Sequence, residues 1–231
     1  MTKPIELYYW PTPNGWKVAI YLEEAGIPYN VNYVNIGAGE QFEPDFLEIS
    51  PNNRMPAIVD PDGPGGSPAS VFESGAILQY LGRKTGKFYP TDERARIKVD
   101  EWLMWQMGGI GPMLGQFHHF HHYAPEEIEY ARDRYANEAH RLYGVLDKRL
   151  SAHEFVAGQE YSIADMAIIS WTTLWERHLI TLDEFPHFHR WREQVLARPA
   201  VVLGLQVGAE KRMNLQDSEE AKKVLFGQRA K

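Results

Sequence analysis

The sequence of 231 residues contains no cysteine. This absence excludes disulfide bonds, thiolate metal sites and a cysteine nucleophile. No apolar run approaches the length of about 18 residues that a membrane-spanning helix needs. Acidic residues outnumber basic ones, and the net charge of −7 argues against nucleic acid or an anionic membrane as the main partner. We therefore expect a soluble, cytoplasmic protein.

The composition is otherwise that of an ordinary globular protein, with 44% hydrophobic and 24% charged residues. A chain of this length can bury one large or two small cores. Strand and helix patterns alternate over its first third. We predict strands at 5–10, 29–34, 57–60 and 69–72, and helices from 16, near 44–49 and from 74.

The order of these elements predicts how the strands pair. A strand, a helix and a second strand in succession require a parallel pair joined by a crossover. The turn-rich segment DGPGGSP separates the last two strands, which should therefore form an antiparallel hairpin. Two prolines and a glycine within residues 11–15 predict a tight loop before the first helix.

From residue 94 onward the chain is predicted to be helical. The segment 108–112 (GGIGP) should bend or break the first long helix, and Ser162 with Asp165 has the form of a capping box at a later helix start. We expect the polar tail from Asn214 to bury little. The predicted fold is α/β plus all-α, with an α/β domain at 1–87, a linker at 88–93 and an all-helical domain at 94–231.

The start of the helix predicted from residue 74 has the features of an anion site. Backbone N–H groups and the positive end of the helix dipole favour a carboxylate there. The Ser74 hydroxyl adds a donor, and Glu73 can answer an ammonium group. Nearby in the sequence, a cis bond between Met55 and Pro56 would turn the Met55 backbone outward, where an extended peptide could pair with it.

Several motifs together resemble one family. They are TPNGWKV, GEQFEPDFLEISPNNRMPAIVD, FESGAILQYL, WQMGGIGPMLGQFHHF, RDRYANEAHRLYGVL and SIAD. With them the chain resembles the cytosolic glutathione transferases, and more narrowly the nu class, the bacterial disulfide-bond reductases related to the yeast nitrogen regulator of the same fold. The resemblance covers nearly the whole chain. It implies an N-terminal thioredoxin-like domain, an all-helical C-terminal domain and a homodimer.

The resemblance also implies a glutathione site. In that class the γ-glutamyl carboxylate lies at the Glu-Ser turn, and the cysteinyl backbone pairs with the residue before a cis-proline. A loop glutamine and a helix arginine also contact the tripeptide, while a threonine and an asparagine of the first loop meet the sulfur. The matching residues here are Thr12, Asn14, Gln41, Met55, Glu73, Ser74 and Arg134, with Arg132 as the alternative to Arg134.

These residue types suit the chemistry of a thiol. The thiol of glutathione has an ordinary pKa of about 8.5, so an enzyme must stabilise its thiolate. The Thr12 hydroxyl, the Asn14 amide and the N–H groups that open the first helix can donate to one sulfur. Thr12 and Asn14 can equally be turn and N-cap residues. Tyr9 is a rival for the sulfur, because Tyr-Trp-Pro resembles the Tyr-aromatic-Pro of other transferase classes, but it can equally be a core aromatic.

Three further residues, His118, His122 and Arg134, allow functional interpretations. His118 and His122 are spaced to share a metal ion on one helix face, but no HExxH-like acid or cysteine completes the set. We therefore predict packing or a pocket lining for them, and no metal. Arg134, without the family resemblance, would be read as a solvated helix charge.

The sequence leaves three functions open. The first is a glutathione-dependent disulfide-bond oxidoreductase acting on small or mixed disulfides, with weaker transferase or peroxidase activity. Because the chain has no CxxC motif, its electrons would come from glutathione bound as a cosubstrate. The second is a conventional transferase that conjugates apolar electrophiles. The third is a non-enzymatic, glutathione-binding regulator.

Overall fold

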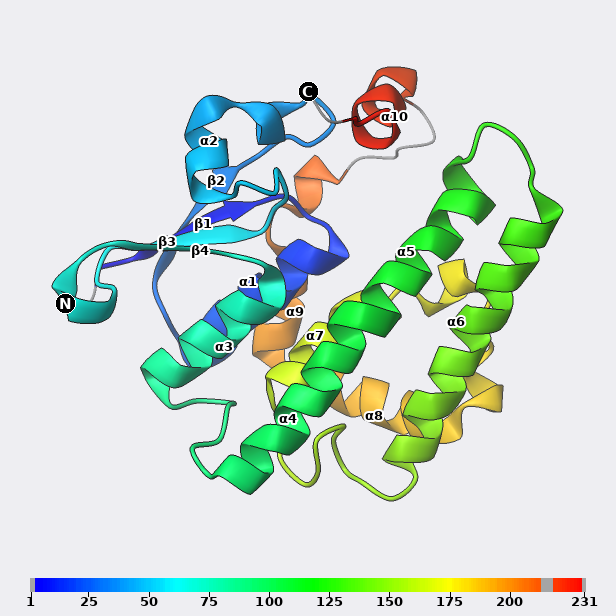
Figure 1. Cartoon of the computed structure of the whole chain (residues 1–231). Helices are drawn as coiled ribbons and strands as arrows, with labels where there is room; N and C mark the ends of the chain where they lie inside the picture. The colour runs from blue at the N-terminus through cyan, green and yellow to red at the C-terminus, as the bar shows by residue number, and fades with distance from the viewer. Residues whose placement is uncertain (1–2, 213–217, 230–231) are drawn as a thin grey trace. The chain divides into compact units, whose positions relative to one another are not determined.

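The computed structural model describes residues 3–212 and 218–229 (Figure 1). The chain divides into two compact units. Unit one combines the N-terminal segment up to Tyr80 with the segment from Leu203 onward, and unit two is Leu81–Val202. The domain boundary that we predict at 88–93 stays a prediction. None of the described helices is both long enough and apolar enough to cross a membrane.

Unit one contains a four-stranded sheet with the strand order β2-β1-β3-β4. Its strands are β1 (Ile5–Tyr9), β2 (Tyr29–Tyr33), β3 (Ala57–Asp60) and β4 (Ala69–Phe72). β1 and β2 are parallel, whereas β3 is antiparallel to both β1 and β4. The predicted parallel pair and hairpin are confirmed.

Helices cover both faces of this sheet. Figure 1 shows α1 and α3 on one side and α2 on the other. The elements are α1 (Pro13–Ala25), a 3-10 turn (Glu40–Phe42), α2 (Pro44–Ile49), a 3-10 turn (Pro64–Gly66), α3 (Ser74–Thr85), a 3-10 turn (Ala209–Lys211) and α10 (Glu219–Phe226). Asn214 lies outside the described residues, and α10 beyond it buries Ala221.

The first helix begins earlier than the sequence predicts. α1 starts at Pro13, because proline fits the first turn of a helix, where its missing N–H has no intrahelical partner. The Thr12 side chain is the N-cap and accepts from the Gly15 N–H at 3.5 Å. Gly15 is required by close packing, since a Cβ there would lie 2.4 Å from the Trp10 carbonyl oxygen. The predicted loop is therefore wrong beyond Thr12.

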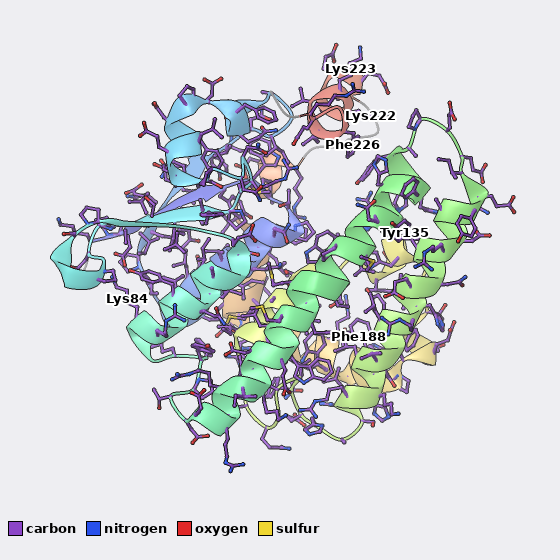
Figure 2. The ribbon with its side chains drawn as sticks, in the orientation of Figure 1. Lys84, Tyr135, Phe188, Lys222, Lys223 and Phe226 are labelled. Atoms are coloured by element: carbon purple, nitrogen blue, oxygen red, sulfur yellow. The ribbon has the colours of Figure 1, made fainter. Side chains whose placement is uncertain are left out.

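Unit two is helical, as predicted. Its elements are α4 (Glu93–Trp105), a π-helical turn (Gln106–Ile110), α5 (Gly111–His118), a second π-helical turn (His119–Tyr123), α6 (Glu129–Leu150), α7 (Ile163–Thr172), two 3-10 turns (Trp175–His178 and Leu182–Glu184) and α8 (Pro186–Leu196). α9 (Pro199–Gln206) connects unit two to unit one. The core includes Leu103, Phe117, Tyr143 and Phe188, the last of which is labelled in Figure 2.

The glycine-rich segment between α4 and α5 does not break the chain's helical path. The backbone widens into the π-helical turn over Gln106–Ile110 and then continues into α5. Pro112 falls in the first turn of α5, where proline is tolerated. Gly115 lets α5 approach α7 closely, because a Cβ there would lie 3.3 Å from the Trp171 ring. The predicted alternative of a break is therefore wrong, and the alternative of a bend stays a prediction.

The capping box at the start of α7 is confirmed, and it reaches further than its sequence shows. The Asp165 carboxylate accepts from the Ser162 N–H and hydroxyl, each at 3.0 Å. It also accepts from the Val156 N–H at 3.0 Å and from the Trp191 indole N–H at 2.9 Å. Burial raises the pKa of Asp165 to about 6, and these donors act in the opposite direction. One side chain thus joins a helix start, a loop and α8.

Replacing Asp165 should destabilise the protein strongly. Asp165→Ala leaves buried donors of Val156, Ser162 and Trp191 without their acceptor, at about 1 to 3 kcal/mol for each unsatisfied group. We expect a loss of at least about 3 kcal/mol in the free energy of unfolding, measured by urea denaturation. The control Glu160→Ala removes an exposed carboxylate and should cost under about 0.5 kcal/mol. Equal losses in the two variants would contradict the assignment.

Candidate functional site

The turn from β4 into α3 brings together two of the predicted ligand residues. Glu73 has a left-handed φ of 68°, which costs a non-glycine residue about 1 to 3 kcal/mol and reverses the chain direction between strand and helix. Its carbonyl accepts from the Ile77 N–H at 2.9 Å, so Glu73 caps α3. The Glu73 side chain is exposed and accepts from the Asn52 amide at 3.4 Å, whereas Ser74 is only 4% exposed. An exposed carboxylate and a buried hydroxyl therefore share one corner.

A lysine that the sequence reading missed lies behind this corner. Lys17 of α1 is 1% exposed, and its Nζ donates to the Ser74 Oγ at 3.2 Å. Burial lowers the pKa of Lys17 to about 7, and the negative charge of Glu73 acts against that shift. The available signal was its setting in WKVAIYL, where Lys17 is the single charged residue of an otherwise apolar run. A lysine is rarely buried fully unless its ammonium group has a partner, so one inside such a run suggests a partner.

Thr12, at the N-cap of α1, contacts Met55, in the loop before β3. The bond between Met55 and Pro56 is cis. The Thr12 hydroxyl donates to the Met55 sulfur at 3.7 Å, and Met55 packs against a cluster that includes Phe46. Within the described residues, no hydrogen bond engages the Met55 backbone N–H. Asn14 follows Thr12 in the first turn of α1, and both side chains are half-buried.

Tyr9 has a different environment from Thr12 and Asn14. Its side chain is 0% exposed, and its hydroxyl donates to the Val207 carbonyl at 3.1 Å. Burial raises the pKa of the phenol far above its ordinary value. The hydroxyl is thus engaged in joining β1 to the segment after α9, which favours the packing interpretation of Tyr9.

Gln41 is held inside its own loop. The side chain is 1% exposed, and its Nε2 donates to the Ile36 carbonyl at 3.2 Å. Its Oε1 is buried and, among the described residues, has no hydrogen-bond donor. Buried acceptors are usually paired, so this oxygen is a candidate for a ligand donor. The predicted ligand contact of Gln41 stays a prediction.

The two candidate arginines of unit two differ in their partners. Arg132 forms ion pairs with Glu127 and with Asp133, the latter at 3.1 Å. Arg134 is exposed, and no ion pair or hydrogen bond to it occurs within the part of the chain that the structure describes. Arg134 is therefore the better placed of the two to receive an anion.

The histidines of unit two form a packed cluster. His118 stacks on His178 with ring centroids 4.7 Å apart, and the Tyr143 hydroxyl lies 2.9 Å from the His178 Nδ1. The His122 Nε2 lies 3.1 Å from the Arg177 carbonyl oxygen. Among the described residues, no group of three or more His, Cys, Asp or Glu side chains is arranged to hold a metal ion. The predicted pair, His118 and His122, thus lies in one cluster of packed aromatic rings.

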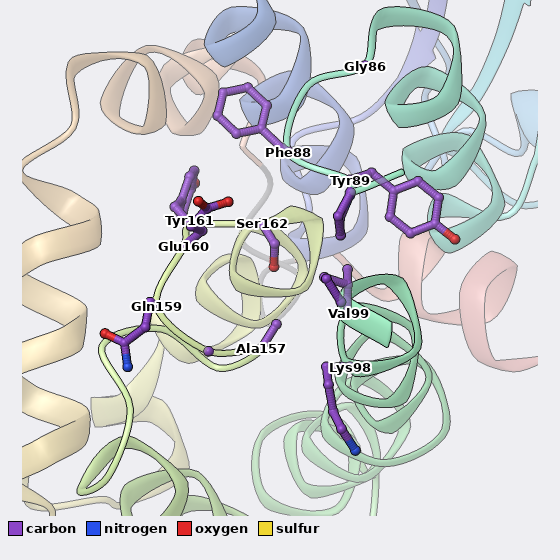
Figure 3. Close-up of a pocket in the computed structure, with 13 residues that line it drawn as sticks. Gly86, Phe88, Tyr89, Lys98, Val99, Ala157, Gln159, Glu160, Tyr161 and Ser162 are labelled. Atoms are coloured by element: carbon purple, nitrogen blue, oxygen red, sulfur yellow. The ribbon is translucent and has the colours of Figure 1, made fainter. Parts of the chain in front are cut away.

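A cavity of about 640 Å³ in unit two contains none of the predicted site residues (Figure 3). It is bounded by the segment before α4, the first turns of α4 and the loop before α7. Lys98 is a charged side chain at its edge, and it pairs with Glu101 at 3.0 Å. This cavity offers space but no converging set of polar groups, so we place the candidate site at the corner of α3.

Comparison with known proteins gives matches over both units. The model of the glutathione S-transferase N-terminal domain matches residues 3–83, and that of the C-terminal domain matches residues 110–199. The chain is 50% identical over 211 residues to the Escherichia coli protein named disulfide-bond oxidoreductase YfcG, covering 90% of this chain and 98% of that protein.

Two solved structures are similar over most of the chain. A glutathione transferase from Pseudomonas putida, with one glutathione disulfide bound per subunit, has a TM-score of 0.84 and 47% identity, covering 88% of this chain and 91% of that one. A glutathione transferase from Burkholderia graminis, with two glutathione molecules bound per subunit, has a TM-score of 0.83 and 45% identity, covering 88% of each chain.

The histidine cluster predicts a loss of stability in acid. Burial, aided by Arg177, lowers the pKa of His118 to about 3, and burial also lowers the pKa of His178. Unfolded histidines take up protons near pH 6.5, so the stabilisation is complete above about that pH and is lost as the pH falls. We expect the free energy of unfolding to fall by about 1.4 kcal/mol per pH unit for each such histidine.

Urea denaturation at pH 7, 6 and 5 measures this slope. His118→Phe should make the slope shallower by about one proton, whereas the control His187→Phe removes an exposed histidine and should leave it unchanged. A wild-type slope that persists in His118→Phe would contradict the role of His118.

Proposed function

Because the chain belongs to the glutathione S-transferase family of enzymes, we propose that it reduces small or mixed disulfides with glutathione as the cosubstrate. Its 50% identity to a protein named a disulfide-bond oxidoreductase supports this choice within the family. The observation that carries most weight is that Lys17 of α1 contacts Ser74 and that Thr12, the N-cap of α1, contacts Met55, within one unit of a chain without cysteine. Such a chain can present a thiol for exchange only by binding one.

In the proposed complex, the γ-glutamyl and cysteinyl residues of the tripeptide each have a recognition group. The carboxylate of the γ-glutamyl group lies at Ser74 and at the N–H groups that open α3. The ammonium of the same γ-glutamyl group faces Glu73. The cysteinyl backbone pairs with Met55. Gln41 contacts the tripeptide from its loop, and Arg134 contributes a positive charge from unit two.

The sulfur chemistry assigned to Thr12 and Asn14 is stabilisation of thiolates. One glutathione thiolate attacks a sulfur of the substrate disulfide, the S–S bond breaks, and the leaving thiolate takes up a proton. A second glutathione thiol then attacks the mixed disulfide, which yields glutathione disulfide and the second reduced product. Donors at one sulfur position favour both the attacking and the leaving thiolate. The two glutathiones and the glutathione disulfide in the related structures correspond to the reductant and the product of this cycle.

The proposal includes a homodimer that acts in the cytoplasm. Apolar side chains are exposed on each unit: Phe72 on the edge strand β4 is 38% exposed, and Ile97 and Met104 on α4 are 46% and 49% exposed. Unpaired strand edges and apolar helix faces of this kind are commonly covered by a second copy in oligomers. Weak transferase or peroxidase activity on small electrophiles accompanies the main reaction.

Steady-state assays distinguish this function from the alternatives. We expect reduction of hydroxyethyl disulfide to exceed conjugation of 1-chloro-2,4-dinitrobenzene by at least about 10-fold in kcat/KM, because stabilising a leaving thiolate serves disulfide exchange directly. Conjugation that is faster by orders of magnitude would identify a conventional transferase. Calorimetric binding of glutathione without measurable turnover of either substrate would identify the non-enzymatic, glutathione-binding regulator.

Two point variants test which side chain serves the sulfur. Asn14→Ala should lower kcat/KM for disulfide reduction by about 10-fold or more, the worth of a hydrogen bond to a charged group. Tyr9→Phe removes a hydroxyl that is engaged with Val207 and should change kcat/KM by less than about 3-fold, with a small drop in melting temperature. The reverse ranking would move the catalytic role to Tyr9.

A further inference from the structure

We propose that Lys17 is the positioning residue that makes the α3 corner specific for the carboxylate of a γ-glutamyl group. This inference rests on the proposed function, since it names what recognises one end of glutathione. It stands on three features of the structure: the burial of Lys17, its hydrogen bond to Ser74, and the opposite charge of Glu73 on the exposed side of the same corner.

A buried charge is costly at this position. Lys17 is surrounded in α1 by buried residues, among them Trp16, Val18 and Tyr21. Transferring an ammonium group from water to such surroundings is costly, and an apolar side chain of similar length would fill the same space. The unfavourable charge is explained if it serves a ligand rather than the core.

The hydrogen bond to Ser74 orients the Lys17 ammonium group toward the start of α3. Because the Lys17 ammonium donates to the Ser74 Oγ at 3.2 Å, the hydroxyl uses a lone pair and not its proton in this contact. A hydroxyl that accepts from a cation is also a stronger donor. The N–H groups of the first turn of α3 lie beside it and add to the positive potential. A carboxylate at the corner would therefore meet Ser74 directly and Lys17 through it.

Glu73 and Lys17 form a pair of opposite charges. This pair is complementary to the ammonium and carboxylate groups of a γ-glutamyl residue. Its exposed carboxylate is held by the Asn52 amide at 3.4 Å, while Lys17 is buried behind Ser74. A γ-glutamyl group carries an ammonium and a carboxylate on the same carbon. Burial lowers the pKa of Lys17 to about 7 and Glu73 opposes that shift, so a bound carboxylate would further favour the charged lysine.

A cycle of two proteins and two ligands tests the pairing of Lys17 with the carboxylate. The ligands are glutathione and γ-aminobutyryl-cysteinyl-glycine, which retains the amine but lacks the α-carboxylate, and the proteins are wild type and Lys17→Met. By calorimetry we expect wild type to bind glutathione at least about 10-fold more tightly than the analogue. In Lys17→Met the preference should fall to within about 3-fold, because the partner of the carboxylate is gone.

Thermal unfolding separates this role from a structural one. Lys17→Met removes a buried charge and should melt at the wild-type temperature or above. Lys17→Gln provides a second, polar variant if the methionine variant does not fold. The control Lys84→Met changes an exposed lysine in the last turn of α3 and should leave both the ligand preference and the melting temperature unchanged (Figure 2).

The outcomes distinguish the two proposals. Wild-type protein that binds glutathione, with the same ligand preference retained in Lys17→Met, would overturn the role of Lys17 and leave the proposed function intact. A variant that melts well below wild type yet binds glutathione as tightly would also overturn it. Failure of wild-type protein to bind glutathione at all would overturn the proposed function.

Discussion

The hydrogen bond between Lys17 and Ser74 is the interaction on which the candidate site depends. It ties α1, which also carries Thr12 at its N-cap, to the start of α3. The left-handed backbone at Glu73 turns the chain so that the hydroxyl is buried and the neighbouring carboxylate is exposed. The two helix starts are therefore fixed relative to one another within unit one. A ligand that spans them meets groups that are already in place, which reduces the entropy lost on binding.

Much of unit one follows from local sequence patterns. Alternating residues and the DGPGGSP turn are sufficient for β3 and β4, and the strand-helix-strand order is sufficient for the parallel pairing of β1 with β2. The start of α1 was missed because proline was read as a breaker, although it is tolerated at the first turn. The segment 108–112 is predicted to bend or break the helix for a similar reason, and the π-helical turn that forms there leaves the helical path unbroken. At the start of α1, the close approach of the Trp10 carbonyl oxygen explains Gly15, which the pattern alone marks as loop.

The candidate site was predictable only where the residue type and its local sequence indicate a role. Glu73 and Ser74 are recognisable at a helix start, and Met55 precedes a proline. The setting of Lys17 in an apolar run signals its burial, but its partner cannot be predicted locally, because Ser74 lies 57 positions away in the chain. The engagement of Tyr9 with Val207 is also invisible locally, since it depends on how the segment after α9 returns to the sheet. Long-range contacts of this kind require the fold before they can be assigned.

The buried basic groups of the two units differ in their surroundings. In unit two, His118 and His178 stack on one another, and burial lowers the pKa of both, so they remain neutral and behave as aromatic core. In unit one, burial also lowers the pKa of Lys17, to about 7, but the negative charge of Glu73 acts against that shift and the ammonium donates to the Ser74 Oγ. Burial alone therefore does not identify a functional group. What sets Lys17 apart is its hydrogen bond to Ser74, the residue that we propose receives the γ-glutamyl carboxylate, so that a charge that is unfavourable in the core would contribute to ligand binding at the surface.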